Sequence, residues 1–169
     1  HMSFKEIEIK NLNINPFTLI GHEWLLITAG TENKFNTMTA SWGGLGVFWG
    51  KNSATVYIRP GRYTKQFVDS NDTFTLSFFS EDYRKALNIC GSLSGRDNNK
   101  VEKANLTPIF DENNTYFKEA KMVVVCKKMY HTEIKPENFD NPSFDEKIYP
   151  EKDYHTIYIG EIVKVLVNE

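Results

Sequence analysis

Two segments of this sequence carry the side chains best suited to ligand chemistry: Asn36–Trp42, which reads NTMTASW, and Ile58–Thr64, which reads IRPGRYT. The first is rich in hydroxyl groups and small residues, which let backbone amides approach a ligand closely. The second holds two arginines, and each guanidinium presents a planar fork of N–H donors that suits phosphate. The pair predicts a site for a ligand with a phosphate and an electron-rich ring. The alternative is structural, because a Thr/Ser-rich strand beside a Pro-Gly turn is also common in β proteins without a ligand.

The turn at Pro60 and Gly61 opens a predicted helix, and the free N–H groups at the start of a helix favour an anion. We expect Arg59 and Thr64 to bind the phosphate. Arg62 has a second interpretation as a surface ion pair, since arginine is usually exposed.

A third segment, CGSLSGRDNNK at Cys90–Lys100, is rich in small residues and predicts a loop that approaches a phosphate or a ring. Lys100 either neutralises phosphate charge or lies in solvent. Cys90 falls on the apolar face of a predicted helix without a neighbouring His or a second Cys, so we interpret its thiol as buried and assign it no catalytic role.

Other candidates have mainly structural interpretations. The segment Phe74–Phe79 alternates Phe74, Leu76 and Phe78 with other residues, which predicts barrel core and leaves Ser77 as a site candidate. His131 and His155 lie near strand ends, where each is either a proton donor or a structural residue. Three further aromatic residues either stack on a ligand ring or close the barrel or a dimer contact: Trp42, Phe48 and Trp49.

Six segments rich in β-branched and aromatic residues, bounded by turn residues, predict strands. They are Trp24–Gly30, Thr37–Trp42, Ala54–Arg59, Thr73–Phe79, Met122–Thr132 and Thr156–Val167. Thr31–Phe35 predicts a hairpin connection, and the regular spacing favours an antiparallel barrel. Helical patterns are short and cover Tyr63–Ser70, Asp82–Cys90 and Asn99–Ala104. The predicted fold is therefore mainly β, a β-rich α+β domain with a few short helices.

The segment Glu133–Asp153 is polar and acid-leaning, and it is marked by prolines and phenylalanines. We predict a solvated loop between the last two long strands. Loops of this length are usually functional or disordered.

Composition narrows the class of protein. The 169 residues fit one domain over residues 3–169, with His1 and Met2 as a cloning remnant. The net charge of -2 and the pI of about 6.1 argue against a dedicated nucleic-acid binder. Cys90 and Cys126 have no metal-ligand spacing, so no metal site is predicted. Without a signal-like segment or a long apolar run, we expect a cytoplasmic protein that does not enter a membrane.

Four motifs, in their order and spacing, resemble the flavin reductase-like, FMN-binding split-barrel family that includes flavoredoxin. They are NTMTASWGGLG from Asn36, IRPGRYT from Ile58, CGSLSGRDNNK from Cys90 and YHTIYIGEIV from Tyr154. The resemblance runs from Pro16 to Val165. It implies a homodimeric split β-barrel that holds FMN at or near the subunit interface.

The resemblance also implies which residues hold the cofactor. It places the flavin ring and ribityl chain against the first motif, where fixed N–H and O–H dipoles stabilise the reduced ring. It places the phosphate against the second motif and the flavin within the loop of the third. The implied cofactor-binding residues are Asn36, Thr37, Met38, Thr39, Ala40, Ser41, Trp42, Arg59, Arg62, Tyr63, Thr64, Ser77, Phe78, Cys90, Gly91, Ser92, Gly95 and Lys100. Tyr154 and His155 are implied on the substrate side.

The leading functional hypothesis is an FMN-dependent oxidoreductase that takes hydride from NADH or NADPH and passes electrons to an acceptor. No G-x-G-x-x-G unit is present, so the nicotinamide nucleotide would bind transiently in the dimer groove. Two alternatives remain. One is a flavoredoxin-like electron carrier that a protein partner reduces, docked on the acidic loop. The other is a ligand-binding barrel without turnover.

Overall fold

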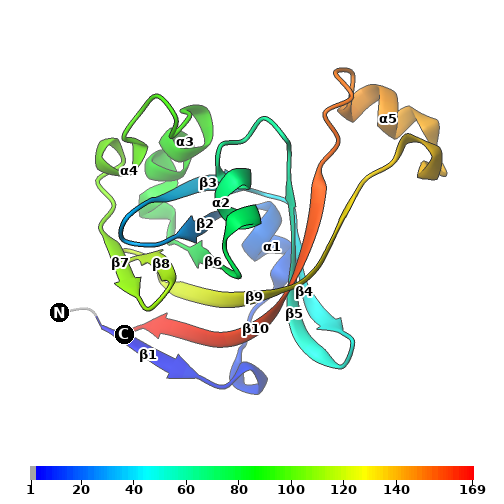
Figure 1. Ribbon diagram of the computed structural model, residues 1–169. Coiled ribbons are helices and arrows are strands. Elements are labelled where there is room, and N and C mark those ends of the chain that lie inside the picture. Colours follow the sequence, from blue (N-terminus) through cyan, green and yellow to red (C-terminus); the bar gives the residue numbers. More distant parts are fainter. Residues whose placement is uncertain (1–2) are drawn as a thin grey trace.

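The computed structural model describes residues 3–169, and its centre is one antiparallel sheet (Figure 1). The strands of this sheet are β1 (Phe4–Ile7), β2 (Leu25–Gly30), β3 (Phe35–Ala40), β4 (Gly44–Phe48), β5 (Lys51–Ile58), β6 (Thr73–Phe78), β9 (Met122–Glu133) and β10 (Thr156–Asn168). They follow the order β3-β2-β6-β9-β10-β5-β4, and β1 pairs with β10. The hairpin β7 (Pro108–Asp111) and β8 (Asn114–Phe117) forms a second sheet. His1 and Met2, which we expected to be a cloning remnant, lie outside the described residues.

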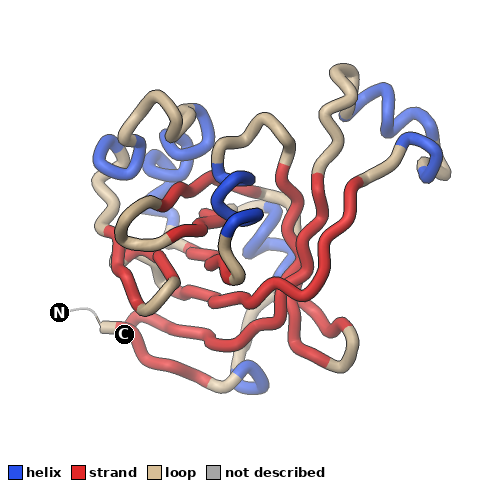
Figure 2. Tube along the Cα trace, in the orientation of Figure 1, coloured by secondary structure: helices blue, strands red, loops and turns tan. Residues whose placement is uncertain are grey.

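Short helices surround the strands (Figure 2). They are α1 (Pro16–Gly21), α2 (Thr64–Ser70), α3 (Arg84–Ser92), α4 (Lys100–Lys103) and α5 (Pro142–Ile148), with 3-10 turns at Ile9–Asn11, Glu81–Tyr83 and Pro136–Asn138. No helix within residues 3–169 is long and apolar enough to cross a membrane.

The central strands are buried on both faces. Ile27 and Val124 pack into one apolar cluster with Phe74, while their chain neighbours Leu26 and Val123 pack into a second cluster that includes α3. This follows from the side-chain period of two in a strand. The predicted alternation of β6 is confirmed, but its second face is covered rather than open to a ligand, since Thr75 donates its hydroxyl proton to the carbonyl of Thr115 in β8.

The six predicted strands are present with shifted ends, whereas β1, β4, β7 and β8 were not predicted. The strand β4 reads GLGVF, and its two glycines weaken any local strand signal. It forms because it pairs with β5 across a turn in which Trp49 and Gly50 both have positive φ. The predicted strand Thr37–Trp42 ends earlier than expected, so Ser41 and Trp42 lie beyond β3.

The segment Glu133–Asp153, which we call the arm, is not the unstructured loop that the sequence predicted. It contains the 3-10 turn Pro136–Asn138 and α5, which stands away from the barrel at the end of long extensions of β9 and β10 (Figure 1). Asn141 begins α5 by accepting a hydrogen bond from the backbone N–H of Ser143 at 3.0 Å. The rings of Tyr149 and Tyr154 pack at 4.8 Å, so aromatic contacts give the arm a small core of its own.

Candidate functional site

A cavity of about 160 Å³ lies where β3 ends beside β5. It is lined by Met38, Thr39, Ala40, Ser41, Trp42, Tyr57, Arg59, Arg62 and His155. All of these except Tyr57 were candidates from the sequence motifs. The strand β3 is at the edge of the sheet, so one side of its backbone is not paired within the sheet. Backbone donors are therefore available at this cavity.

The hydroxyl groups of β3 serve the fold instead of facing a ligand, which corrects the expectation from the motif. Thr37 is fully buried, and its Oγ1 lies 2.8 Å from Oγ1 of Thr28 and donates to the carbonyl of Ile27. Thr39 donates its hydroxyl proton to the carbonyl of Leu87 in α3. What β3 offers to a ligand is its backbone edge.

Arg62 lines this cavity, and Lys100, which lines a second cavity, is close enough to interact with its charge. Burial lowers the pKa of Arg62, and it lowers the pKa of Lys100 to about 8, with a further contribution from the nearby charge of Arg62. Lys100 is 3% exposed and donates to the carbonyls of Cys90 at 3.0 Å and Leu93 at 3.2 Å. None of the ion pairs within residues 3–169 includes either cation. Asp97 lines the same cavity as Lys100 but forms no described ion pair with either cation, so the pair still fits an anionic group.

Arg59, which we expected at the phosphate, has other partners. Its Nη1 lies 2.9 Å from Oδ1 of Asp153, and its Nη2 donates to the carbonyl of Ile148 at 3.2 Å. Its guanidinium carbon lies 5.1 Å from the ring centroid of Tyr149. The adjacent guanidinium lowers the pKa of Asp153. Arg59 therefore lines the cavity while it ties the arm to the end of β5.

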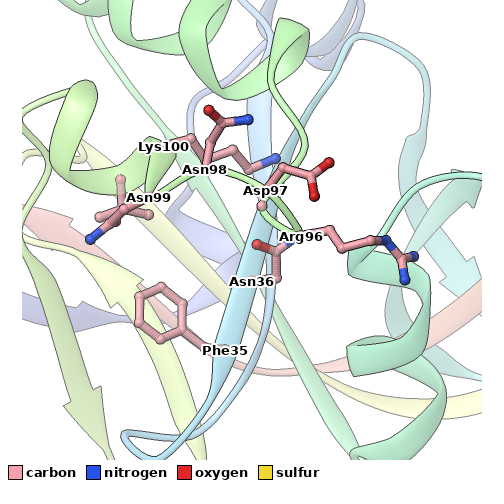
Figure 3. A pocket seen from close by; sticks show the side chains of 9 residues that line it. Phe35, Asn36, Arg96, Asp97, Asn98, Asn99 and Lys100 are labelled. Atoms are coloured by element: carbon pink, nitrogen blue, oxygen red, sulfur yellow. The ribbon is translucent and has the colours of Figure 1, made fainter.

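A second cavity, of about 440 Å³, lies beside Asn36 (Figure 3). It is lined by Phe35, Asn36 and the residues from Gly95 to Val101. Asn36 donates to the hydroxyl of Thr64 at 2.9 Å. A Cβ atom on Gly95 would lie 1.9 Å from Oδ1 of Asn36, so this position requires glycine. Arg96 extends toward α2 and lies over the ring of Tyr63 at 4.6 Å. The first three motifs thus meet in space.

His155 joins the first cavity to the arm. Its ring lies 5.3 Å from that of Trp42, and its Nδ1 lies 2.6 Å from the hydroxyl of Tyr149, a residue that the sequence analysis did not single out. Burial and the charge of Arg59 lower the pKa of His155 to about 4. The imidazole is therefore neutral near pH 7. Tyr154, expected beside it, instead donates to Asp145 at 2.8 Å and does not line the cavity.

Several expected site residues do not reach either cavity. Ser77 and Phe78 are fully buried on opposite faces of β6. The thiol of Cys90 is interior, and burial raises its pKa to about 11. Gly91 packs beside Thr39, and Ser92 is exposed at the end of α3. These positions follow from the covered second face of the sheet, which no local pattern revealed. No group of three or more His, Cys, Asp and Glu within residues 3–169 is arranged to hold a metal ion.

Comparison with known proteins places this geometry in a family. The family model described as flavin reductase like domain matches residues 18–169. The chain belongs to the flavin reductase like domain family. A search among curated proteins found no match.

Solved structures of the same fold support the assignment. A flavoredoxin from Methanosarcina acetivorans is 19% identical, with 85% of this chain and 67% of that chain covered at a TM-score of 0.66. An FMN-binding domain of a flavin reductases-like enzyme from Shewanella baltica is 16% identical, with 98% and 77% covered at 0.68. An NADH:FAD oxidoreductase from Streptomyces globisporus is 14% identical, with 85% and 73% covered at 0.63. The sheet is that of a split-barrel flavin reductase-like protein.

Proposed function

We propose that this protein binds FMN and acts as an NAD(P)H-dependent flavin reductase. The observation that carries the proposal is the interacting pair of cations, Arg62 in the first cavity and Lys100 in the second, which has no carboxylate partner among the described ion pairs. A phosphate there would offset the cost of holding two like charges in a partly buried site.

The residues present fit the phosphate end of FMN. Lys100 uses two of its three N–H donors on carbonyls, which leaves the third for a ligand. Arg62 has no side-chain hydrogen bond within residues 3–169, so its planar fork is available to a phosphate. The bond between Asn36 and Thr64 holds β3 against α2 beside these cations.

The residues near Trp42 fit the ring end. When bound, FMN supplies the hydride and electron chemistry, and the protein supplies orientation and electrostatics. Backbone N–H groups at the end of β3 would donate to the pyrimidine edge of the ring, where negative charge develops on reduction. A cavity of about 400 Å³ shares Ser41, Trp42 and Tyr57 with the first one and gives room for a second ring beside the half-exposed indole. That ring would be the nicotinamide.

The choice of a reductase over an electron carrier has one support outside the site. The Streptomyces globisporus protein of the same fold is described as an NADH:FAD oxidoreductase. In this chain the arm, where an electron-transfer partner would dock, instead contributes to the border of the cavity through its contact with His155.

We also propose a homodimer. Three large apolar side chains at or near the hairpin of β4 and β5 are exposed: Val47 is 70% exposed, Trp49 is 63% exposed and Tyr130 is 49% exposed. The rings of Trp49 and Tyr130 lie 5.8 Å apart. Exposed apolar patches of this kind mark association surfaces. Sedimentation equilibrium of the protein should give a dimer, and Trp49→Ser should shift the equilibrium toward monomer.

The test of the proposed function is spectroscopic. The purified protein is mixed with FMN, excess flavin is removed, and NADH or NADPH is added without oxygen while the visible spectrum is followed. We expect retained flavin whose absorption bleaches with one or both nucleotides.

The other outcomes are equally informative. Retained flavin that stays oxidised with both nucleotides would contradict the reductase and leave an electron carrier. A protein that retains no flavin would contradict a bound cofactor.

A further inference from the structure

The end of the arm makes a direct hydrogen bond to the cavity. Tyr149 follows α5, and its hydroxyl oxygen lies 2.6 Å from Nδ1 of His155, just before β10. The two side chains are only 6% and 7% exposed. Such a short bond in a low-dielectric setting fixes the orientation of both rings.

The direction of this bond follows from the protonation states. Burial raises the pKa of Tyr149, so its phenol keeps its proton near pH 7. The neutral phenol has one O–H to donate, and Nδ1 of His155 is the acceptor described for it within residues 3–169, so we assign the phenol as the donor. The imidazole is also neutral, because burial and Arg59 hold its pKa at about 4. A neutral imidazole that accepts at Nδ1 carries its proton on Nε2.

The Nε2–H group then has no acceptor within residues 3–169. The described hydrogen bond of the His155 ring is the one at Nδ1, and Nε2 is not among the buried atoms that lack a partner. His155 lines the same cavity as Arg62 and stacks near Trp42. The remaining donor is thus available to a ligand in that cavity.

Arg59 holds Tyr149 in this position. Its guanidinium donates to the carbonyl of Ile148, pairs with Asp153 and lies over the Tyr149 ring. A cation at this place favours the neutral imidazole of His155 and offsets part of the rise that burial causes in the pKa of Tyr149.

We propose that Tyr149 is a positioning residue: it donates to Nδ1 of His155 and so presents a neutral Nε2–H donor to the cavity. This inference rests on the proposed function, because the acceptor would be a carbonyl oxygen or ring nitrogen of bound flavin. The imidazole acts as a fixed hydrogen-bond donor, not as a proton source.

Nitrogen NMR of uniformly ¹⁵N-labelled protein tests the tautomer directly, without flavin and without activity. Long-range proton–nitrogen correlations should show His155 protonated on Nε2 in the wild type. In Tyr149→Phe the ratio of this tautomer to the other should fall by about tenfold, the effect of one lost hydrogen bond. The matched control is Tyr154→Phe, which removes a hydroxyl that lies next to the end of the arm and donates to Asp145 instead, and it should leave the tautomer unchanged.

Addition of FMN separates the two proposals. We expect the Nε2 resonance of His155 to shift as FMN binds. A wild type protonated on Nδ1, or FMN binding without a shift at Nε2, would overturn the positioning role and leave the flavin site standing. Failure to bind FMN would overturn the proposed function together with the ligand contact. Even if Tyr149→Phe does not fold, the tautomer of His155 in the wild type shows whether Nδ1 accepts the hydrogen bond from Tyr149.

Discussion

Arg59 and Arg62 lie on the same turn after β5 and line the same cavity, yet their surroundings differ. Arg59 has an ion pair with Asp153, a hydrogen bond to a carbonyl and an aromatic ring beneath it. Arg62 has no ion pair within residues 3–169, and the charge described as interacting with it is the like charge of Lys100. On one side of the cavity the charge of Arg59 is paired with a carboxylate, whereas on the other side the charge of Arg62 has no such partner within residues 3–169.

The difference shows that contacts with residues distant in sequence determine whether each of these arginines has a structural role or is available to a ligand. The arm supplies Asp153 and the Ile148 carbonyl to Arg59, and it supplies Tyr149 to His155. Nothing equivalent reaches Arg62. We therefore assign ligand binding to the side of Arg62 and positioning to the side of Arg59, and four predictions follow from this division.

The largest effect is expected from Arg62→Ala. FMN affinity should fall roughly 10- to 150-fold, because a charge-assisted hydrogen bond contributes about 1.5–3 kcal/mol. Fluorescence titration of FMN measures the change. Lys85→Ala, which removes an exposed cation from α3, is the matched control and should bind FMN normally. Equal affinities in the two variants would remove Arg62 from the site.

The pH dependence of FMN affinity tests Lys100. Its pKa of about 8 in the free protein means that the ammonium loses its proton above that pH, and a bound phosphate requires the proton back. FMN affinity should therefore fall as pH rises above about 8, and the decrease should approach about tenfold for each pH unit. Lys100→Met should bind FMN more weakly near neutral pH and lose this dependence. A wild-type affinity that is flat across this range would contradict the role of Lys100.

On the other side of the cavity, Arg59→Ala should loosen the arm. Hydrogen exchange in α5 and at Tyr149 should become faster because the ion pair and the carbonyl bond are lost, while exchange in β6 and β9 stays slow. FMN affinity should change less than in Arg62→Ala. The assignment of the two arginines would be contradicted if Arg59→Ala lowered FMN affinity more than Arg62→Ala does and left hydrogen exchange in the arm slow.

The smallest effect concerns acid stability. The folded-state pKa of His155 is about 4, below the ordinary 6.5, so between these values the unfolded chain binds more protons than the folded one. The free energy of unfolding should decrease as pH falls through this window. Urea unfolding at several pH values measures the slope, and His155→Gln should have a shallower one. Identical slopes would mean that His155 titrates normally in the folded protein.

Local patterns predicted much of the fold and part of the site. The long strands were found because β-branched and aromatic residues dominate them, and eight of the lining residues of the first cavity were singled out from their motifs. The strand β4 was not predicted because its two glycines weaken the local strand pattern. The helix α5 was not predicted because its N-cap residue, Asn141, lies within a polar segment. Such elements depend on tertiary partners that no short window contains.

The errors at the site have one physical origin. Thr37, Thr39 and Ser77 were expected to lie at the flavin because the resemblance to the family implied it, which would leave a polar face of each strand open to the ligand. In this fold that face is covered: Thr39 bonds α3, and Thr37 and Ser77 are fully buried. Tyr149 could not be found from sequence, because its importance comes from a contact across the base of the arm.

The measurement that tests the central claim most directly compares FMN with riboflavin, which lacks the phosphate, in the wild type, Arg62→Ala and Arg59→Ala. The wild type and Arg59→Ala should both prefer FMN by at least about tenfold, the effect of one charge-assisted bond, and Arg62→Ala should lose most of that preference. A preference that survives Arg62→Ala but disappears in Arg59→Ala would place the phosphate on the other side of the cavity and contradict the account.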